Sequence, residues 1–139
     1  MSIDKSFGNT NELKVLNYLN SLPEYVNNQF TLNPLRYDTF DFKNETITAE
    51  LKSRRNAHND YPTTMIGYNK VEKAENNPDR IYQFYFLFTD GLYLWNRENS
   101  NYKINIGGRN DRGSGEWKPY CFIPVDELNL ITTSIKSIS

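Results

Sequence analysis

The octapeptide IYQFYFLF at residues 81–88 constrains the fold of this 139-residue chain more than any other segment. Apolar and aromatic side chains stand at both odd and even positions, and successive side chains of a strand point to opposite faces. A strand with two apolar faces suits the centre of a sheet and not its edge. Asp90-Gly91 follows and predicts a tight turn into another strand at 92–95. These segments predict a sheet with residues 81–88 in its middle.

The composition favours a sheet-rich core. The chain has 10 Tyr, 8 Phe and 2 Trp, although its hydrophobic fraction is only 37%. Aromatic and β-branched side chains pack well on the surface of a sheet. A chain of this length normally forms one domain around one hydrophobic core, so we expect a single domain over residues 1–139.

The residues before the predicted sheet have the pattern of a helix. Asn9 or Thr10 can cap this helix, and Pro23 stops it after Leu22. Glu12 then falls in the first turn, where an acid three residues after Asn9 resembles a capping box and complements the helix dipole. The apolar stripe of the helix is expected to contain Leu13, Leu16 and Leu19.

Local patterns predict further elements in the second half of the chain. Pro62 opens a predicted second helix that ends before Pro78. Strands are predicted at 102–106 and 120–123, and a helical turn is predicted at 124–128. The side chains expected on the buried side of the second helix are Met65, Ile66, Tyr68, Val71 and Ala74.

Residues 36–55 have the pattern of a β-hairpin. Two runs with alternating apolar side chains flank the polar segment Lys43-Asn44-Glu45, which suits a short turn. Glu50 and Lys52 alternate with the apolar residues of the second run and therefore share its polar face. The apolar positions of that run are Ile47, Ala49 and Leu51.

The register of this hairpin decides which acid faces Glu50. If Phe40 and Phe42 continue the apolar face, Asp41 lies beside Glu50 on the polar face. A three-residue turn would instead place Asp38 opposite Glu50, because register depends on loop length and a slip of one residue exchanges the faces. Both registers bring two carboxylates together near a lysine.

Two adjacent carboxylates and a lysine suit the hydrolysis of phosphodiester bonds with a divalent ion. Mg²⁺ is usually held by one or two carboxylates together with waters and substrate phosphate. A nearby lysine can orient the attacking water or stabilise charge on the phosphate. The pattern Glu-x-Lys also occurs at 12–14 and 116–118, but only the copy at 50–52 ends a strand with an acidic hairpin partner. The alternative is a surface strand with an ordinary Glu/Lys pair.

The sequence from Asp41 through eight residues to Glu50-Leu51-Lys52 resembles the PD-(D/E)XK nuclease superfamily, which includes restriction endonucleases and Holliday-junction resolvases. The resemblance implies an α/β fold with a restriction-endonuclease-like αβββαβ core, a mixed central sheet and, in this chain, extra C-terminal strands. It also implies that Asp41, Glu50 and the backbone carbonyl of Leu51 bind Mg²⁺ or Mn²⁺, and that Lys52 is the catalytic lysine. The chain departs from the family name in that no proline precedes Asp41.

The resemblance extends to the first helix. Glu12 matches an acidic residue that often completes the metal site of relatives, and helix capping is the alternative role. Asp38 replaces Asp41 as a metal ligand if the other register holds. The nuclease-like core is expected at about 8–90, a C-terminal β extension at about 91–131 and a frayed tail at 132–139. The residues expected to take part in catalysis are Glu12, Asp41, Glu50 and Lys52.

The expected function is hydrolysis of DNA phosphodiester bonds through a metal-activated water. Two alternatives stay open, namely a catalytically inactive module that binds nucleic acid or protein, and an RNA endonuclease. The net charge is −1, so a DNA-binding surface must be a local patch. Glycines within 107–115 predict a mobile loop that can close over a phosphate backbone. The residues predicted to contact nucleic acid are Arg54, Arg55, Lys70, Arg109 and Arg112.

Several classes of site are excluded or disfavoured by composition. The single His58 and the single Cys121 exclude a structural zinc site and an intramolecular disulfide. His58 is predicted to contact solvent or phosphate. No apolar run reaches membrane-spanning length and the first residues lack the apolar core of a signal peptide, so we expect a cytoplasmic protein without a membrane partner. The resemblance also suggests a homodimer, for which the aromatic residues can supply an interface.

Overall fold

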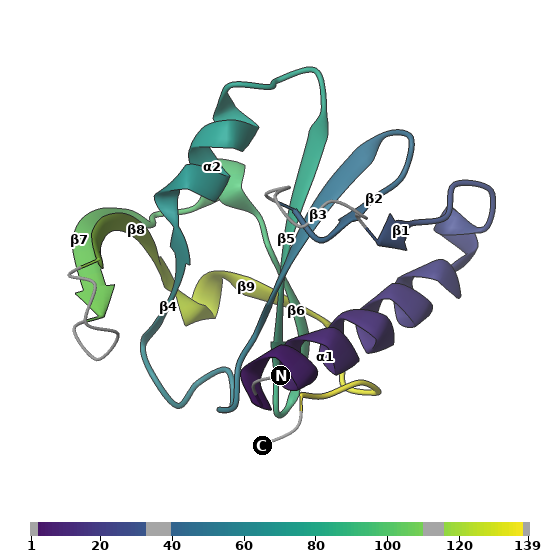
Figure 1. Cartoon of the computed structure of the whole chain (residues 1–139), viewed down its shortest axis with the longest axis horizontal. Helices are drawn as coiled ribbons and strands as arrows, with labels where there is room; N and C mark the ends of the chain where they lie inside the picture. The colour runs from purple at the N-terminus through teal and green to yellow at the C-terminus, as the bar shows by residue number, and fades with distance from the viewer. Residues whose placement is uncertain (1–2, 33–39, 110–115, 138–139) are drawn as a thin grey trace.

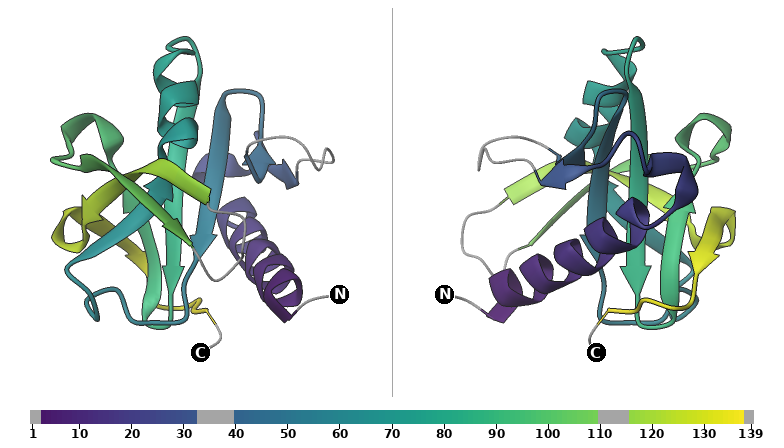
Figure 2. Two further views of the ribbon diagram at one scale, coloured as in Figure 1. Left: turned by 60° about the vertical axis from the view of Figure 1, so that its left-hand side comes forward. Right: turned by 90° about the vertical axis from the view of Figure 1, so that its right-hand side faces the viewer.

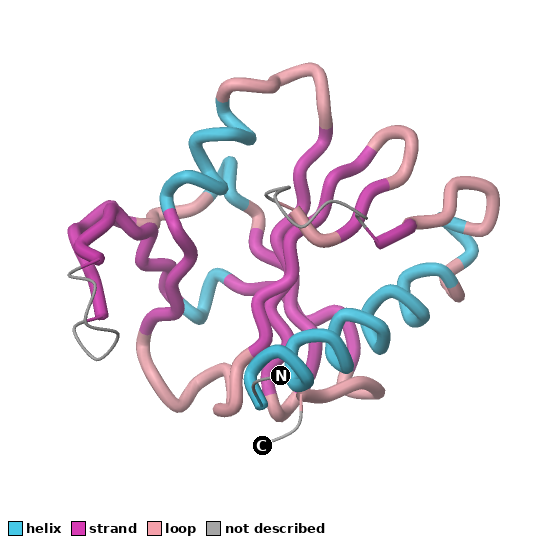
Figure 3. Tube along the Cα trace, in the orientation of Figure 1, coloured by secondary structure: helices cyan, strands magenta, loops and turns pink. Residues whose placement is uncertain are grey.

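The computed structural model of the chain describes residues 3–32, 40–109 and 116–137. Figures 1 and 3 show its helices, α1 (Ile3–Asn20) and α2 (Tyr68–Glu75), around a strongly twisted sheet. Short 3₁₀ turns occur at Pro23–Tyr25, Arg97–Asn99 and Val125–Glu127. The strands are β1 (Thr31–Leu32), β2 (Phe42–Lys43), β3 (Ile47–Ser53), β4 (Thr63–Gly67), β5 (Ile81–Phe88), β6 (Gly91–Trp95), β7 (Lys103–Arg109), β8 (Glu116–Pro124) and β9 (Leu128–Thr132).

The main sheet of the described residues has the strand order β1-β2-β3-β5-β6-β9. β3 and β5 are parallel and the other neighbours are antiparallel, so the sheet is mixed, and the predicted α/β class is confirmed. β5 covers the predicted residues and lies inside the sheet between β3 and β6. Gly91 has a φ of +154°, and a Cβ there would lie 2.8 Å from the Thr132 carbonyl oxygen, so the predicted turn after β5 requires glycine.

A smaller antiparallel sheet, β4-β8-β7, packs with α2 on one face of the main sheet, and α1 covers the other face (Figure 2). This arrangement creates two apolar clusters. The cluster beneath α1 includes Val15, Leu19, Phe42, Ala49, Leu51 and Leu87. The cluster beneath α2 and the small sheet includes Phe40, Ile66, Val71, Phe84, Phe86 and Ile123.

Helix α1 begins earlier than the sequence suggested. It starts at Ile3, so Glu12 lies in the middle of the helix, and the predicted capping role of Glu12 is wrong. The buried stripe also differs from the prediction, because Leu13 is 49% exposed. Asn11, Val15 and Leu19, spaced four residues apart, face the sheet instead. The buried face of the helix is thus rotated from the predicted one, and Glu12 directly follows the buried residue Asn11.

Asn11 is a buried amide on α1. Its side-chain oxygen and nitrogen have no partner within the part of the chain that the structure describes. An unsatisfied buried polar group costs about 1–3 kcal/mol. Asn11→Leu is therefore expected to raise the free energy of unfolding by about 1 kcal/mol, measured by urea titration. Asn17→Leu on the exposed face of the same helix is the control and is expected to change it by less than about 0.5 kcal/mol.

The predicted second helix is wrong in its first half. Residues 63–67 form β4, which pairs antiparallel with β8 from Thr63 opposite Pro124 to Gly67 opposite Tyr120. Burial alternates along this strand, because Ile66 is 2% exposed and Met65 is 37% exposed. The β-branched side chains of this segment find a distant pairing partner in β8, and this tertiary pairing prevails over a local helical pattern. The helix begins only at residue 68.

The C-terminal segments also differ from the predictions. β7 continues to residue 109, so the first two glycines of the predicted loop belong to a strand. β9 falls mostly within the expected C-terminal β extension, although no individual strand was assigned to it, and it forms one edge of the main sheet. Ser137 is buried, its N–H donates to the Phe88 oxygen at 2.9 Å, and its hydroxyl donates to the Arg54 oxygen. Ser137 is therefore tied to the residues at the ends of β3 and β5.

None of the helices in the described ranges has the length and hydropathy to span a membrane.

Candidate active site

The hairpin of β2 and β3 places Asp41 opposite Glu50. Phe42 pairs with Ala49, and the Asp41 N–H donates to the Ala49 oxygen at 3.1 Å. The chain bends at Asp41 before β2 begins, so Phe40 and Phe42 enter different apolar clusters. The predicted common face of these two phenylalanines is therefore wrong, although Asp41 lies beside Glu50 as expected. Asp38 lies outside the described residues.

β2 pairs with only the first part of β3, and Asp41 lies along the same edge of β3 beyond that pairing. Its Oδ2 accepts the Leu51 N–H at 2.8 Å, where a backbone carbonyl of β2 would otherwise bind. The N–H and C=O of one residue in a strand point to the same edge. The Leu51 carbonyl thus lies on the Asp41 side of β3, and carboxylate and carbonyl oxygens come together there.

Glu50 is a buried acid beside two lysines. It is 3% exposed, and its Oε1 lies 3.5 Å from Lys52 Nζ and 3.5 Å from Lys70 Nζ. Burial and the charge of Asp41 raise the pKa of Glu50 to about 8, although both lysines lower it. A surface strand with an ordinary ion pair does not have these properties, so that alternative is wrong. The ionised form of Glu50 is therefore one that the fold only partly compensates.

Glu12 reaches the same acidic group from α1. Burial, followed by the charge of Asp41 and a side-chain hydrogen bond with it, raises the pKa of Glu12 to about 7. Glu12, Asp41 and Glu50 come from three segments, and the charge of Asp41 raises the cost of ionising the other two. A cation at this point would remove that cost, and the available oxygen donors match the ligand preference of Mg²⁺.

The acids do not form a closed metal cage. No group of three or more His, Cys, Asp or Glu in the described ranges is arranged to hold an ion by itself. Mg²⁺ commonly uses only one or two carboxylates and completes its shell with waters and substrate phosphate. Two carboxylates and the Leu51 carbonyl therefore fit an open Mg²⁺ or Mn²⁺ site, and do not fit a site saturated by protein ligands.

A basic cavity of about 420 Å³ opens beside the acids. It contains lysines from three elements, namely Lys52 on β3, Lys70 on α2 and Lys118 on β8. Its other lining residues are Gly67, Asn69, Pro119 and Tyr120. Acids that suit a cation thus adjoin a cavity that suits an anion. A phosphate bound to a divalent ion requires such a pair of neighbouring environments.

The residues predicted to bind nucleic acid lie in different parts of the fold. Lys70 lines the basic cavity, and Arg55 is exposed. The Arg54 guanidinium donates to the Met65 oxygen at 2.6 Å and to Thr64 Oγ1 at 3.4 Å, so it joins the end of β3 to β4, and burial lowers its pKa. The side chain of Arg109 and the whole of Arg112 lie outside the described residues.

Sequence reasoning did not include Lys118 and Asn69 among the site residues. Lys118 closes the third Glu-x-Lys pattern of the chain, which follows the glycine-rich segment. β8 carries it to the cavity because Tyr120, two residues on, pairs with Gly67 of β4. The pairing of β4 with β8 is long-range, so no local sequence signal connects Lys118 with the site.

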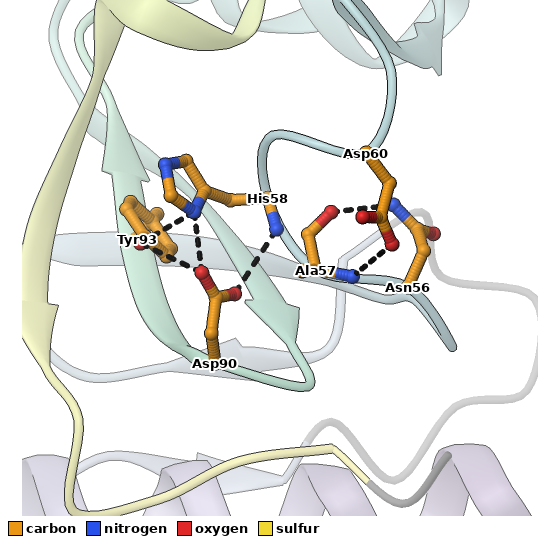
Figure 4. A network of polar contacts seen from close by, with 6 residues as sticks. All are labelled: Asn56, Ala57, His58, Asp60, Asp90 and Tyr93. Atoms are coloured by element: carbon orange, nitrogen blue, oxygen red, sulfur yellow. Dashed lines mark hydrogen bonds and ion pairs between the residues drawn. The ribbon is translucent and has the colours of Figure 1, made fainter.

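His58 belongs to a polar network that the sequence did not predict (Figure 4). The ring atom Nδ1 of His58 contacts the Asp90 carboxylate and lies 2.9 Å from the Tyr93 hydroxyl. The backbone N–H of His58 donates to Asp90 Oδ1 at 3.0 Å. The His58 ring stacks on Tyr93 with 4.6 Å between centroids. Burial raises the pKa of Asp90, but the hydrogen bonds from His58 outweigh it, so the pKa is lowered. These contacts fix the loop that follows β3.

The chain was compared with models of known protein families. The model of the family described as "Phage putative PDDEXK endonuclease" matches residues 12–131. The matched range begins at Glu12 and includes Asp41, Glu50 and Lys52. No curated protein matches the chain, and no solved structure matches it.

Proposed function

Because the chain belongs to this phage family of PD-(D/E)XK endonucleases, we propose that it is a metal-dependent nuclease that hydrolyses DNA phosphodiester bonds. The observation that carries the proposal is the position of Glu50. Its buried carboxylate lies between Asp41 on one side and the ammonium groups of Lys52 and Lys70 on the other. Glu50 therefore borders both a site that suits a cation and a site that suits an anion. Phosphodiester hydrolysis with a metal ion uses both kinds of site.

The oxygen ligands of the proposed site come from three groups. Asp41, Glu50 and the Leu51 carbonyl would hold Mg²⁺ or Mn²⁺, and Glu12 would hold Asp41 in place through their hydrogen bond. The bound ion would neutralise charge on the phosphate and lower the pKa of a water molecule beside it. This assignment accounts for three acids at one point of the fold, which would otherwise be an unfavourable arrangement.

The lysines would act on the phosphate and on the attacking water. Lys52 lines the basic cavity and lies 3.5 Å from Glu50, so its ammonium group can hold a water or a phosphate oxygen at the boundary between acids and cavity. Lys70 and Lys118 would bind phosphate oxygens as point charges. Steering of the backbone by lysines carries no sequence information, so it suits a general contact with DNA.

The proposal is tested by incubating the native chain with plasmid, single-stranded and branched DNA in Mg²⁺, Mn²⁺ or EDTA. We expect cleavage of DNA that depends on the ion and stops in EDTA. Matched RNA strands are assayed in parallel. Cleavage of RNA alone would identify an RNA endonuclease, and binding of DNA without any cleavage, equal in EDTA, would identify an inactive binding module. Either result would contradict the proposed DNA hydrolysis.

The basic cavity makes a separate prediction about salt. Lys118→Ala removes one phosphate contact, so binding of DNA is expected to weaken uniformly across sequences, and the slope of log K against log salt is expected to fall by about 0.7–0.9. The measurement is fluorescence anisotropy in EDTA over a series of salt concentrations. Lys103→Ala on β7, an exposed lysine that does not line the cavity, is the matched control. Equal slopes for the native chain and Lys118→Ala would contradict the assignment.

A further inference from the structure

A second cavity, of about 300 Å³, takes no part in the reaction proposed above. Its lining includes Phe88 from the core, Phe122 from β8, Tyr61 and Thr63 around β4, and His58 and Arg54 from the segment after β3. Cavities of this size that combine aromatic walls with a few polar groups are the usual form of small-molecule sites. The chemistry of these lining residues indicates which class of ligand the cavity would bind.

The position of the cavity connects it with the basic cavity. The Arg54 N–H donates to the Leu87 oxygen at 2.9 Å, so the β3–β5 ladder continues for one residue beyond β3. The side chains of Lys52 and Arg54 therefore project from the same face of the chain, and their Cα atoms are about 7 Å apart. Lys52 lines the basic cavity, and Arg54 lines the second one. Adjoining sites for a phosphate and for an aromatic group have the layout of a nucleotide.

The walls of the second cavity suit a flat aromatic ring. Phe88 is buried, while Tyr61 is 62% exposed and is free to close over a ligand at the rim. Stacking on aromatic side chains is how proteins hold unpaired bases, whichever base is present. Thr63, which is exposed on β4, leaves the entrance open because its side chain is short.

His58 adds a ring nitrogen to these walls, and this nitrogen is an acceptor in the neutral tautomer that carries its proton on Nδ1. Asp90 and Tyr93 occupy Nδ1, and Figure 4 shows the other ring nitrogen turned away from Asp90. That nitrogen, Nε2, has no partner among the described residues. A proton on Nδ1, donated to the Asp90 carboxylate, leaves Nε2 of the neutral ring as an acceptor. An exocyclic amino group on a base is the complementary donor.

We propose that the second cavity binds one unpaired nucleobase with an exocyclic amino group, from the DNA strand whose phosphate occupies the basic cavity. The inference rests on the proposed nuclease function, because it takes the ligand to be part of that substrate. The base stacks against the aromatic walls and donates to His58 Nε2, so one nucleotide spans Lys52 and Arg54. The chain would then select substrates that expose a single unpaired base near the cleaved bond.

The test uses deoxycytidine 5′-monophosphate, thymidine 5′-monophosphate and deoxyribose 5-phosphate as probes, titrated into the native chain in EDTA and followed by NMR. We expect the cytidine nucleotide to bind at least about 5-fold more tightly than deoxyribose 5-phosphate, because stacking contributes that much or more per base. Thymidine 5′-monophosphate, whose base lacks an exocyclic amino group, is expected to bind more weakly than the cytidine nucleotide. Equal affinity of all three probes would overturn the proposal.

Two variants locate the binding in the cavity. Thr63→Trp fills the entrance, and Tyr61→Ala removes the exposed ring, so both are expected to reduce the affinity for the cytidine nucleotide toward that of deoxyribose 5-phosphate. Thr31→Trp, which adds the same ring to an exposed residue of β1, is the control and is expected to change nothing. Unchanged affinity in both cavity variants would overturn the proposal. Cleavage assays are separate, so the nuclease function can fail or hold independently.

Discussion

Glu50→Gln is expected to reduce DNA cleavage by at least about 10³-fold and, at the same time, to make the metal-free chain more stable. The two effects have one cause. Burial raises the pKa of Glu50 to about 8, so the ionised carboxylate that would bind a cation is also the form that the fold disfavours. Glutamine has nearly the same shape and carries no charge. Lys52 and Lys70 retain contact with water after its removal, because their side chains are 33% and 18% exposed.

The measurement combines a cleavage assay with thermal unfolding in EDTA at pH 8. We expect the midpoint Tm of Glu50→Gln to exceed that of the native chain by about 2–6 °C. Glu45→Gln, in the exposed turn of the same hairpin, is the matched control and is expected to cleave DNA normally. Lys52→Ala is expected to lose about 10²–10³-fold in activity. Full activity of Glu50→Gln or of Lys52→Ala would contradict the proposed mechanism.

The second large effect concerns pH. Without metal, the free energy of unfolding is expected to fall as the pH rises from about 4.5 to about 8. The pKa of Glu50 rises from 4.5 to about 8 on folding, and that of Glu12 from 4.5 to about 7. Between these values the folded chain keeps protons that the unfolded chain has lost. Since the folded state binds more protons, raising the pH favours unfolding. The contribution is complete below pH 4.5 and is lost above the folded pKa values.

A divalent ion should reverse this dependence. Carboxylates bind metal in the deprotonated form, so the affinity for Mn²⁺ is expected to rise with pH and binding is expected to release protons. Urea titrations at pH 5, 6, 7 and 8, with Mn²⁺ or with EDTA, give the free energy of unfolding directly. Glu50→Gln is expected to make the curve in EDTA less steep, because the contribution of Glu12 remains, and to remove most of the response to Mn²⁺. Parallel curves for the native chain and Glu50→Gln would show that Glu50 is not the group responsible.

The parts of the fold that the sequence predicted well are those with local causes. β5 follows from an apolar run long enough for one strand, and the turn at Gly91 follows from a residue that tolerates its backbone conformation. Glu50 and Lys52 share a face because a strand alternates by geometry alone. The predicted position of Asp41 beside Glu50 assumes that Phe40 and Phe42 share a face. In the structure the chain bends at Asp41 and separates the two phenylalanines, although Asp41 still lies beside Glu50.

The parts that the sequence missed depend on partners far along the chain. Residues 63–67 carry a pattern compatible with a helix, and only pairing with β8 makes them a strand. Leu13 and Val15 are both acceptable on a buried face, and packing of α1 against the sheet selects Val15. Lys118 reaches the basic cavity through the same pairing of β4 with β8. Local propensity contains none of this information.

The hydrogen bond from the Leu51 N–H to Asp41 has a spectroscopic consequence. Amide groups in the interior of a sheet normally donate to a neighbouring backbone, and their NMR frequencies then report only on the fold. The Leu51 amide donates to a carboxylate that would bind the metal. Its resonance is therefore sensitive to what binds Asp41, so one backbone signal in a ¹⁵N-labelled sample reports whether the proposed metal site is occupied, without any added probe.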